Sequence, residues 1–128
     1  MEKRITRGKK SLASAERLFD LSADEFGARL ASVRSALYLL FNEGYHGSDE
    51  QNPLQASLCA EAIRLTDLLI RSPLSARPDV HALQALFCLN AARLPTRLDD
   101  DGVFVPLVEQ DRSQWDSRLI ARGSVAAR

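Results

Sequence analysis

The chain has 128 residues, of which 45% are hydrophobic and 27% are charged, and its formal net charge at pH 7 is zero. This length is typical of one domain with a single hydrophobic core, and the composition excludes a disordered or fibrous protein. No apolar run is long enough to span a bilayer, and no apolar segment follows the basic N-terminus. The sequence therefore predicts neither a membrane partner nor a secretory signal.

The first segment, residues 1–18, is basic and weakly helical. Residues 1–10 carry five cationic side chains, Lys3, Arg4, Arg7, Lys9 and Lys10, opposed by one carboxylate, so the rest of this neutral chain is net acidic. A weak apolar stripe favours a helix that Gly8 interrupts and that needs a partner. A basic tip on an acidic body is typical of a phosphate contact, and it is equally typical of a solvated terminus.

A strong amphipathic helix is predicted next. Ser22 and Glu25 have the spacing of a capping box, in which each side chain accepts a hydrogen bond from the other residue's backbone. Apolar residues then recur at steps of three and four, which predicts a helix over residues 23–42. Gly44 is in the position of a C-terminal cap.

Proline marks the start of two further helices. Asn52 and Pro53 predict a helix that ends near Arg71, and Pro78 opens another that Pro95 closes. The loops between these helices are short, and no 34-residue repeat is evident at the residue level. We therefore expect an all-α fold of about five helices, arranged as a bundle or as a tetratricopeptide-like array.

The helical pattern breaks over residues 96–109. Asp100, Asp101 and Gly102 indicate a turn, and residues 103–105 favour a short extended stretch that Pro106 restricts to an edge. Asp111 is then expected to cap a last helix, with Gln114 at its third position.

No constellation of residues indicates catalysis. The two cysteines, Cys59 and Cys88, lie in apolar helical patterns and are expected to be inert core thiols in a reducing cytoplasm. The acidic run before Gly102 lacks the ligand spacing of a calcium loop, and Glu43 with His46 lacks the second motif that a carboxylate-bridged metal site needs. Nucleophile and phosphate-binding motifs are absent from the sequence, so we expect no enzyme activity, metal or cofactor.

Two groups of side chains stay open to two interpretations. Asn42, Glu43 and Tyr45 end the strong helix, either as a structural cluster with the Tyr45 hydroxyl at the rim of the core or as part of a ligand pocket. Trp115 is either a core residue or a binding-site aromatic.

Four stretches occur in an order that resembles a known family. They are ALYLLFNEGYHG, LCAEAIRLTDLL, ALQALFCLNAAR and DDDGVFVPLVEQDRSQWDSRLIARG, within residues 26–123. Together they resemble the tetratricopeptide-like C-terminal extension of one branch of extracytoplasmic-function sigma factors, in the sigma-70 family. KRITRGKKSL, which precedes them, resembles the end of the region 4 recognition helix.

The resemblance implies a division of the chain and a set of roles. Residues 1–18 would be the remnant of region 4 with its linker, and residues 19–128 would be the helical extension. Four side chains of the remnant would face the −35 promoter element: Arg4, Arg7, Lys9 and Lys10. Matching family strings also indicate a polar pocket formed by Asn42, Glu43, Tyr45, Asp111, Arg112 and Trp115.

The resemblance also implies partners and a limit. RNA polymerase core and promoter DNA would be the partners in the full-length protein, and a further protein could bind the helical surface. Region 2 and most of region 4 are missing, so this chain alone is not expected to direct transcription. Two other functions stay open: a stand-alone helical adaptor with an exposed apolar groove, and a small-molecule sensor with a closed pocket beneath residues 42–45.

Overall fold

The computed structural model describes residues 2–14, 22–47 and 51–128. Within these residues the chain forms five α-helices: α1 (Glu2–Ser14), α2 (Ala23–Tyr45), α3 (Ala56–Arg71), α4 (Pro78–Ala91) and α5 (Ser117–Ala126). Three short 3₁₀-helices lie between α4 and α5: η1 (Leu94–Thr96), η2 (Leu107–Glu109) and η3 (Arg112–Gln114). β-Pairing in the described residues is limited to one isolated antiparallel bridge, Leu98 with Phe104. The predicted all-α fold with an irregular segment near residues 96–109 is confirmed.

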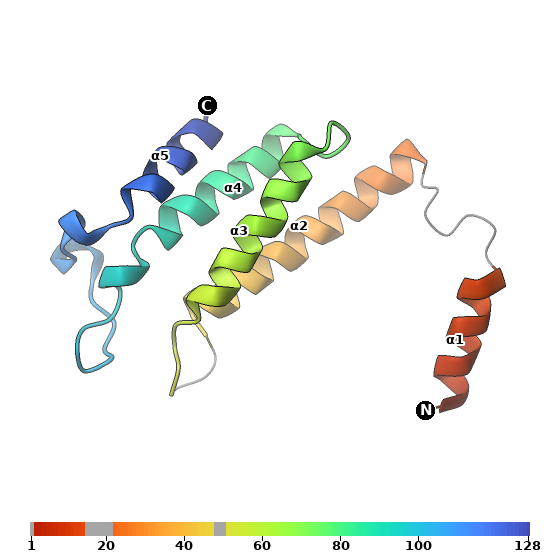
Figure 1. Ribbon diagram of the computed structural model, residues 1–128, viewed down its shortest axis with the longest axis horizontal. Coiled ribbons are helices and arrows are strands. Elements are labelled where there is room, and N and C mark those ends of the chain that lie inside the picture. Colours follow the sequence, from red (N-terminus) through yellow and green to blue (C-terminus); the bar gives the residue numbers. More distant parts are fainter. Residues whose placement is uncertain (1, 15–21, 48–50) are drawn as a thin grey trace.

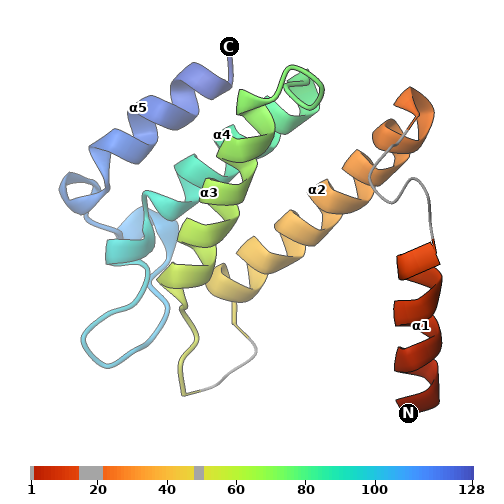
Figure 2. The same cartoon turned by 45° about the vertical axis from the view of Figure 1, so that its right-hand side comes forward.

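The helices from α2 to α5 pack in chain order. α2 packs on α3, α3 on α4 and α4 on α5, while α2 also contacts α4. Figure 1 shows the row that results, and the turned view in Figure 2 shows α3 and α5 on either side of α4. In both views α1 lies apart from this body, beyond the N-terminal end of α2.

The core lies where α2, α3 and α4 meet. Phe41 of α2 stacks on Phe87 of α4, with ring centroids 4.4 Å apart. Stacked aromatic rings contribute about 0.5–1.5 kcal/mol beyond the area that they bury. Both thiols, Cys59 and Cys88, are fully buried here, as the sequence predicted.

Two predicted helix starts agree with the structure. The Ser22 hydroxyl accepts a hydrogen bond from the Glu25 backbone N–H at 3.2 Å, and the Glu25 carboxylate accepts one from the Ser22 N–H at 2.9 Å. This is the capping box, and α2 begins directly after it. Pro78 opens α4 as expected, because a proline at the first helical position gives up no hydrogen bond.

Four predicted boundaries were wrong. α1 runs through Gly8 without a break. α2 passes Gly44 and ends at Tyr45, and α3 begins at Ala56 rather than at Pro53. Asp111 caps η3, whereas α5 starts six residues later.

Contacts between segments explain the two corrections at the α2–α3 corner. The Gln55 N–H donates to the Gly44 carbonyl at 2.8 Å, and the Gly47 N–H donates to the Pro53 carbonyl at 2.9 Å. Residues 53–55 thus pair with the end of α2 instead of starting a helix. A Cβ on Gly44 would lie 2.7 Å from the Gln55 oxygen, so glycine is needed here for close approach rather than as a cap.

Candidate functional site

The basic side chains of α1 are exposed to solvent. The four that the resemblance assigns to DNA, Arg4, Arg7, Lys9 and Lys10, all lie on the surface of this helix, as does Lys3. Lys3, Arg7 and Lys10 border one shallow hollow, as their spacing of four and three residues dictates. This arrangement presents several cations on one face, which suits a phosphate backbone or an acidic protein surface.

The end of α2 contributes a tyrosine to the core. Asn42 is half-buried and Glu43 is exposed, while Tyr45 is only 5% exposed and its ring lies 5.6 Å from that of Phe41. The hydroxyl of Tyr45 accepts a hydrogen bond from the Arg93 guanidinium. Tyr45 therefore has an apolar body in the core and a satisfied polar end.

Arg97 lies between two aromatic rings. Its guanidinium carbon is 3.9 Å from the ring centroid of Tyr45 and 4.9 Å from that of Phe104. The same side chain donates to the Tyr45 carbonyl at 3.3 Å and to Nδ1 of His46 at 2.8 Å. Burial, followed by the charge of Arg97, lowers the pKa of His46, so a neutral imidazole accepts this hydrogen bond.

The residues at η3 form a second cluster. The Asp111 carboxylate accepts hydrogen bonds from the backbone and hydroxyl of Ser113 and from the Gln114 amide, and these bonds lower its pKa. The guanidinium carbon of Arg112 lies 5.7 Å from the ring centroid of Trp115. The indole N–H of Trp115 donates a hydrogen bond to the Thr96 hydroxyl at 3.0 Å. Trp115 is half-buried.

The six predicted pocket residues thus belong to two separate groups. Tyr45 contacts Arg93 and Arg97, whereas Trp115 contacts Thr96, so the two groups attach to η1 and its flanks through different residues. Asp111 bonds within its own turn. Arg93, Thr96 and Arg97 were not predicted as site residues. The two arginines are four residues apart just after a predicted helix, and this spacing was visible in the sequence as a sign that both could contact one partner.

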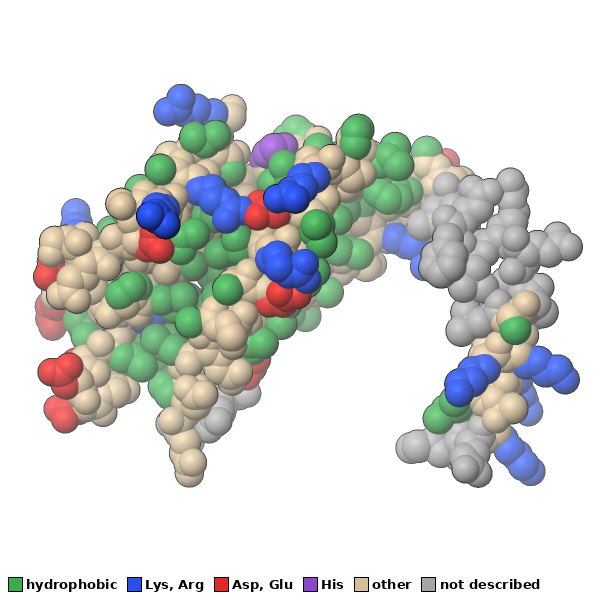
Figure 3. All heavy atoms as spheres, viewed as in Figure 1, with side chains coloured by type: hydrophobic (Ala, Val, Ile, Leu, Met, Phe, Trp, Pro, Cys, Tyr) green, Lys and Arg blue, Asp and Glu red, His purple; other side chains and the backbone are tan. Residues whose placement is uncertain are grey.

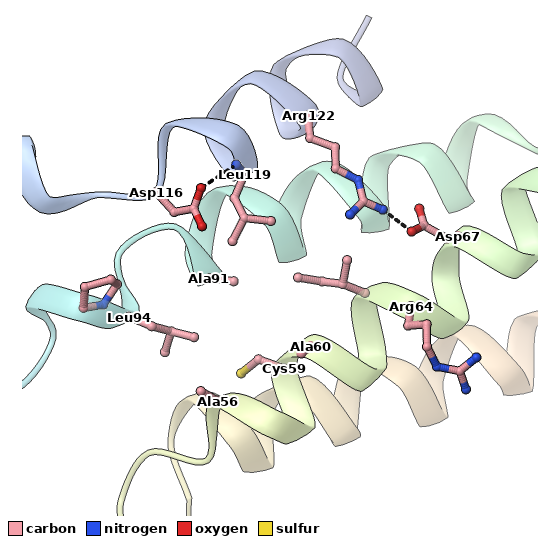
Figure 4. Close-up of a pocket in the computed structure, with 12 residues that line it drawn as sticks. Ala56, Cys59, Ala60, Arg64, Asp67, Ala91, Leu94, Asp116, Leu119 and Arg122 are labelled. Atoms are coloured by element: carbon pink, nitrogen blue, oxygen red, sulfur yellow. Dashed lines mark hydrogen bonds and ion pairs between the residues drawn. The ribbon is translucent and has the colours of Figure 1, made fainter.

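A groove opens between α3, η1 and α5, with a volume of about 500 Å³. Its floor is apolar and combines small side chains with two leucines: Ala56, Cys59, Ala60 and Ala91, with Leu94 and Leu119. In Figure 4 these residues point into the space between the helices, and an ion pair between Asp67 of α3 and Arg122 of α5 crosses one end. Asp116 lies at the other end.

The thiol that lines the groove is not activated as a nucleophile. Burial raises the pKa of the Cys59 thiol to about 11, so the thiol stays protonated and is a poor nucleophile at neutral pH. Among residues 2–14, 22–47 and 51–128, His, Cys, Asp and Glu side chains nowhere gather in a group of three that could hold a metal ion. No helix in that part of the chain is long and apolar enough to cross a membrane.

These features define an all-α protein with a basic N-terminal helix and a body built from packed helices. The chain belongs to a family described as a family of unknown function, DUF6596, which its residues 29–128 match. This family is found in sigma-70-like proteins in general. The match covers α2 from Arg29 onward, together with α3, α4 and α5.

One curated relative shows the same region within a longer protein. An uncharacterized protein of Rhizobium meliloti (strain 1021) is 41% identical over 121 residues, which are 94% of this chain and 28% of that protein. The chain therefore spans little more than a quarter of the relative's length. No solved structure matches the chain significantly.

Proposed function

We propose that this chain is the helical C-terminal region of an extracytoplasmic-function sigma factor, and that it acts in transcription initiation as part of a longer protein. The observation that carries the proposal is the order of elements. A basic, exposed helix directly precedes a body whose family is found in sigma-70-like proteins. The longer relative supports a role inside a larger polypeptide.

In this proposal the two parts of the chain do different work. Arg4, Arg7, Lys9 and Lys10 of α1 meet the phosphates and base edges of the −35 element, as the end of a recognition helix does. The body of α2 to α5 packs beside region 4 or contacts RNA polymerase or another protein, and so adjusts promoter engagement. A cytoplasmic location follows from the same role.

The longer relative offers a direct test. Its full-length form, a form without the region that aligns with this chain, and a chimera carrying this chain in that region would be compared in run-off transcription with bacterial core RNA polymerase. We expect the full-length protein and the chimera to start transcription at a shared promoter, and the shortened form to be weaker. Failure of the full-length relative to bind core polymerase would refute the proposal.

A stand-alone helical adaptor is the second candidate, and the apolar groove between α3, η1 and α5 favours it. Such grooves accept the apolar face of a partner helix. Ala60 lines the groove and is exposed, so replacing it with tryptophan would fill the groove without disturbing the core. An adaptor would lose its partner in the Ala60→Trp variant while showing no association with polymerase.

A further inference from the structure

Residues 99–111, which we call the acidic loop, carry charge of a single sign. They contain five carboxylates, Asp99, Asp100, Asp101, Glu109 and Asp111, and no lysine or arginine. The same loop exposes large apolar side chains: Val103 is 59% exposed, Leu107 47% and Val108 86%. An exposed apolar surface with a charged rim is typical of a protein interface.

The acidic loop is held in one conformation by its own hydrogen bonds. The Asp99 carboxylate accepts from the backbone N–H groups of Asp101 and Val103, at 3.0 and 2.8 Å. Gly102 takes a positive φ of 78° at the turn, and the buried Gln110 amide donates to the Val105 carbonyl at 3.0 Å. A surface that is already ordered loses little conformational entropy when a partner binds.

Helix α1 has the complementary chemistry. Its thirteen residues hold five cations against one carboxylate, and Ile5 is 56% exposed. A helix of this length is marginal in water unless it packs against something. The extensively packed helix pairs of the described chain involve only α2, α3, α4 and α5, so the body leaves α1 in need of a surface.

The two complementary surfaces lie at opposite ends of the molecule. α1 precedes the N-terminal end of α2, whereas the acidic loop adjoins its C-terminal end, where Arg97 links Tyr45 to Phe104. The 23 residues of α2 separate these ends by about 34 Å. Figure 3 shows the same separation, with blue side chains gathered on α1 and red ones at the far end of the body.

We propose that the acidic loop binds α1 of a second copy of this chain. Two copies aligned antiparallel along α2 bring each α1 beside the other copy's acidic loop, so both contacts form together and the pair closes with twofold symmetry. Ile5 packs against the exposed apolar side chains of the loop, while Lys9 and Lys10 face its carboxylates. DNA and the second copy then compete for the same cations.

The test is a charge exchange measured by sedimentation velocity of the full chain over a concentration series at low salt. Lys9→Glu with Lys10→Glu reverses two of the charges on α1, and Asp100→Lys with Asp101→Lys reverses two of the charges on the acidic loop. Either pair should weaken dimerisation about tenfold or more. A mixture of the two variants should form a heterodimer, because one of its contacts joins the two exchanged surfaces, the other is unchanged, and opposite charges therefore meet at both. Arg128→Glu, which reverses an exposed charge outside α1, α2 and the acidic loop, should leave the dimer unchanged.

A second variant tests the apolar part of the contact. Val108→Ser alters a side chain that is 86% exposed, so it should weaken dimerisation without changing the circular dichroism spectrum. A chain that stays monomeric over the whole series would overturn the proposal. So would a dimer that both charge-reversed variants leave intact, or a contact between α1 and the loop that forms within one copy at all concentrations.

Discussion

The guanidinium of Arg97 lies 3.9 Å from the ring centroid of Tyr45 and donates a hydrogen bond to the carbonyl of that same residue. These two residues are 52 positions apart in the sequence, and their contact fixes the irregular segment against the end of α2. One side chain thereby connects the helical core to the base of the acidic loop.

Replacing Arg97 with alanine should lower the free energy of unfolding by about 1–2 kcal/mol, because a cation–π contact and a hydrogen bond to a carbonyl are lost together. Urea denaturation followed by circular dichroism measures the change. Arg97→Lys keeps the positive charge but lacks the planar guanidinium group, so its stability should fall between those of Arg97→Ala and the unchanged protein. Equal stability of Arg97→Ala and an exposed control, Arg29→Ala, would show that the contact contributes nothing.

His46 should make the stability depend on pH. Burial and Arg97 lower its pKa in the folded state, so the unfolded chain binds this proton more readily. Stability from this group is therefore fully present above the unfolded pKa of about 6.5, and it is lost as pH falls below that value and through the lower folded pKa. Urea midpoints measured between about pH 7.5 and about pH 5.5 should fall, and His46→Gln should flatten this part of the profile.

Gly44→Ala should destabilise the protein although alanine favours helices. Its Cβ would lie 2.7 Å from the Gln55 oxygen and 2.9 Å from the Cys59 nitrogen, so backbone must move, at a cost of about 2–4 kcal/mol. Gly27 provides a matched control in the same helix, because the nearest atom to its added Cβ is a flexible Arg77 nitrogen at 3.7 Å. Gly27→Ala should stabilise α2 by about 0.5–1 kcal/mol in thermal melts.

Asp67 should contribute more to stability than its ion-pair partner. Its carboxylate accepts a hydrogen bond at 2.6 Å from Gln84, which is only 2% exposed, and it also pairs with Arg122. Asp67→Ala leaves a buried amide unsatisfied and should cost about 2 kcal/mol, whereas Arg122→Ala removes a half-exposed pair and should cost less than about 1 kcal/mol. Similar losses in urea denaturation for the two variants would contradict this ranking.

The start of α5 should depend on Asp116 and not on Asp111. The Asp116 carboxylate accepts from the backbone N–H groups of Arg118 and Leu119, whereas Asp111 bonds only around η3. Asp116→Ala should therefore cost about 1 kcal/mol, as the loss of an N-cap usually does. Hydrogen exchange over residues 117–126 should accelerate in this variant and stay unchanged in Asp111→Ala.

Local patterns in the sequence determined the helical class and the starts of α2 and α4. The capping box at Ser22 and Glu25, the proline at position 78 and the burial of Cys59 and Cys88 were all predicted correctly, because each depends on neighbouring residues or on the period of one helix. The wrong helix boundaries at the α2–α3 corner lie where segments distant in the sequence meet. Gly44 resembled a cap, and residues 52–53 resembled a helix start, because the hydrogen bonds that join these segments leave no periodic signal.

The candidate sites show the same division. The sequence by itself located the basic residues of α1 and the acidic run before Gly102, since charge is visible without a fold. Only the tertiary structure decided that Tyr45 and Trp115 belong to different clusters, that Arg97 lies between two rings, and that alanines of α3 and α4 form the floor of a groove. The physical reason is that composition and hydrophobic periodicity describe one segment at a time. A contact between distant side chains, or a groove, exists only where packing has brought segments together.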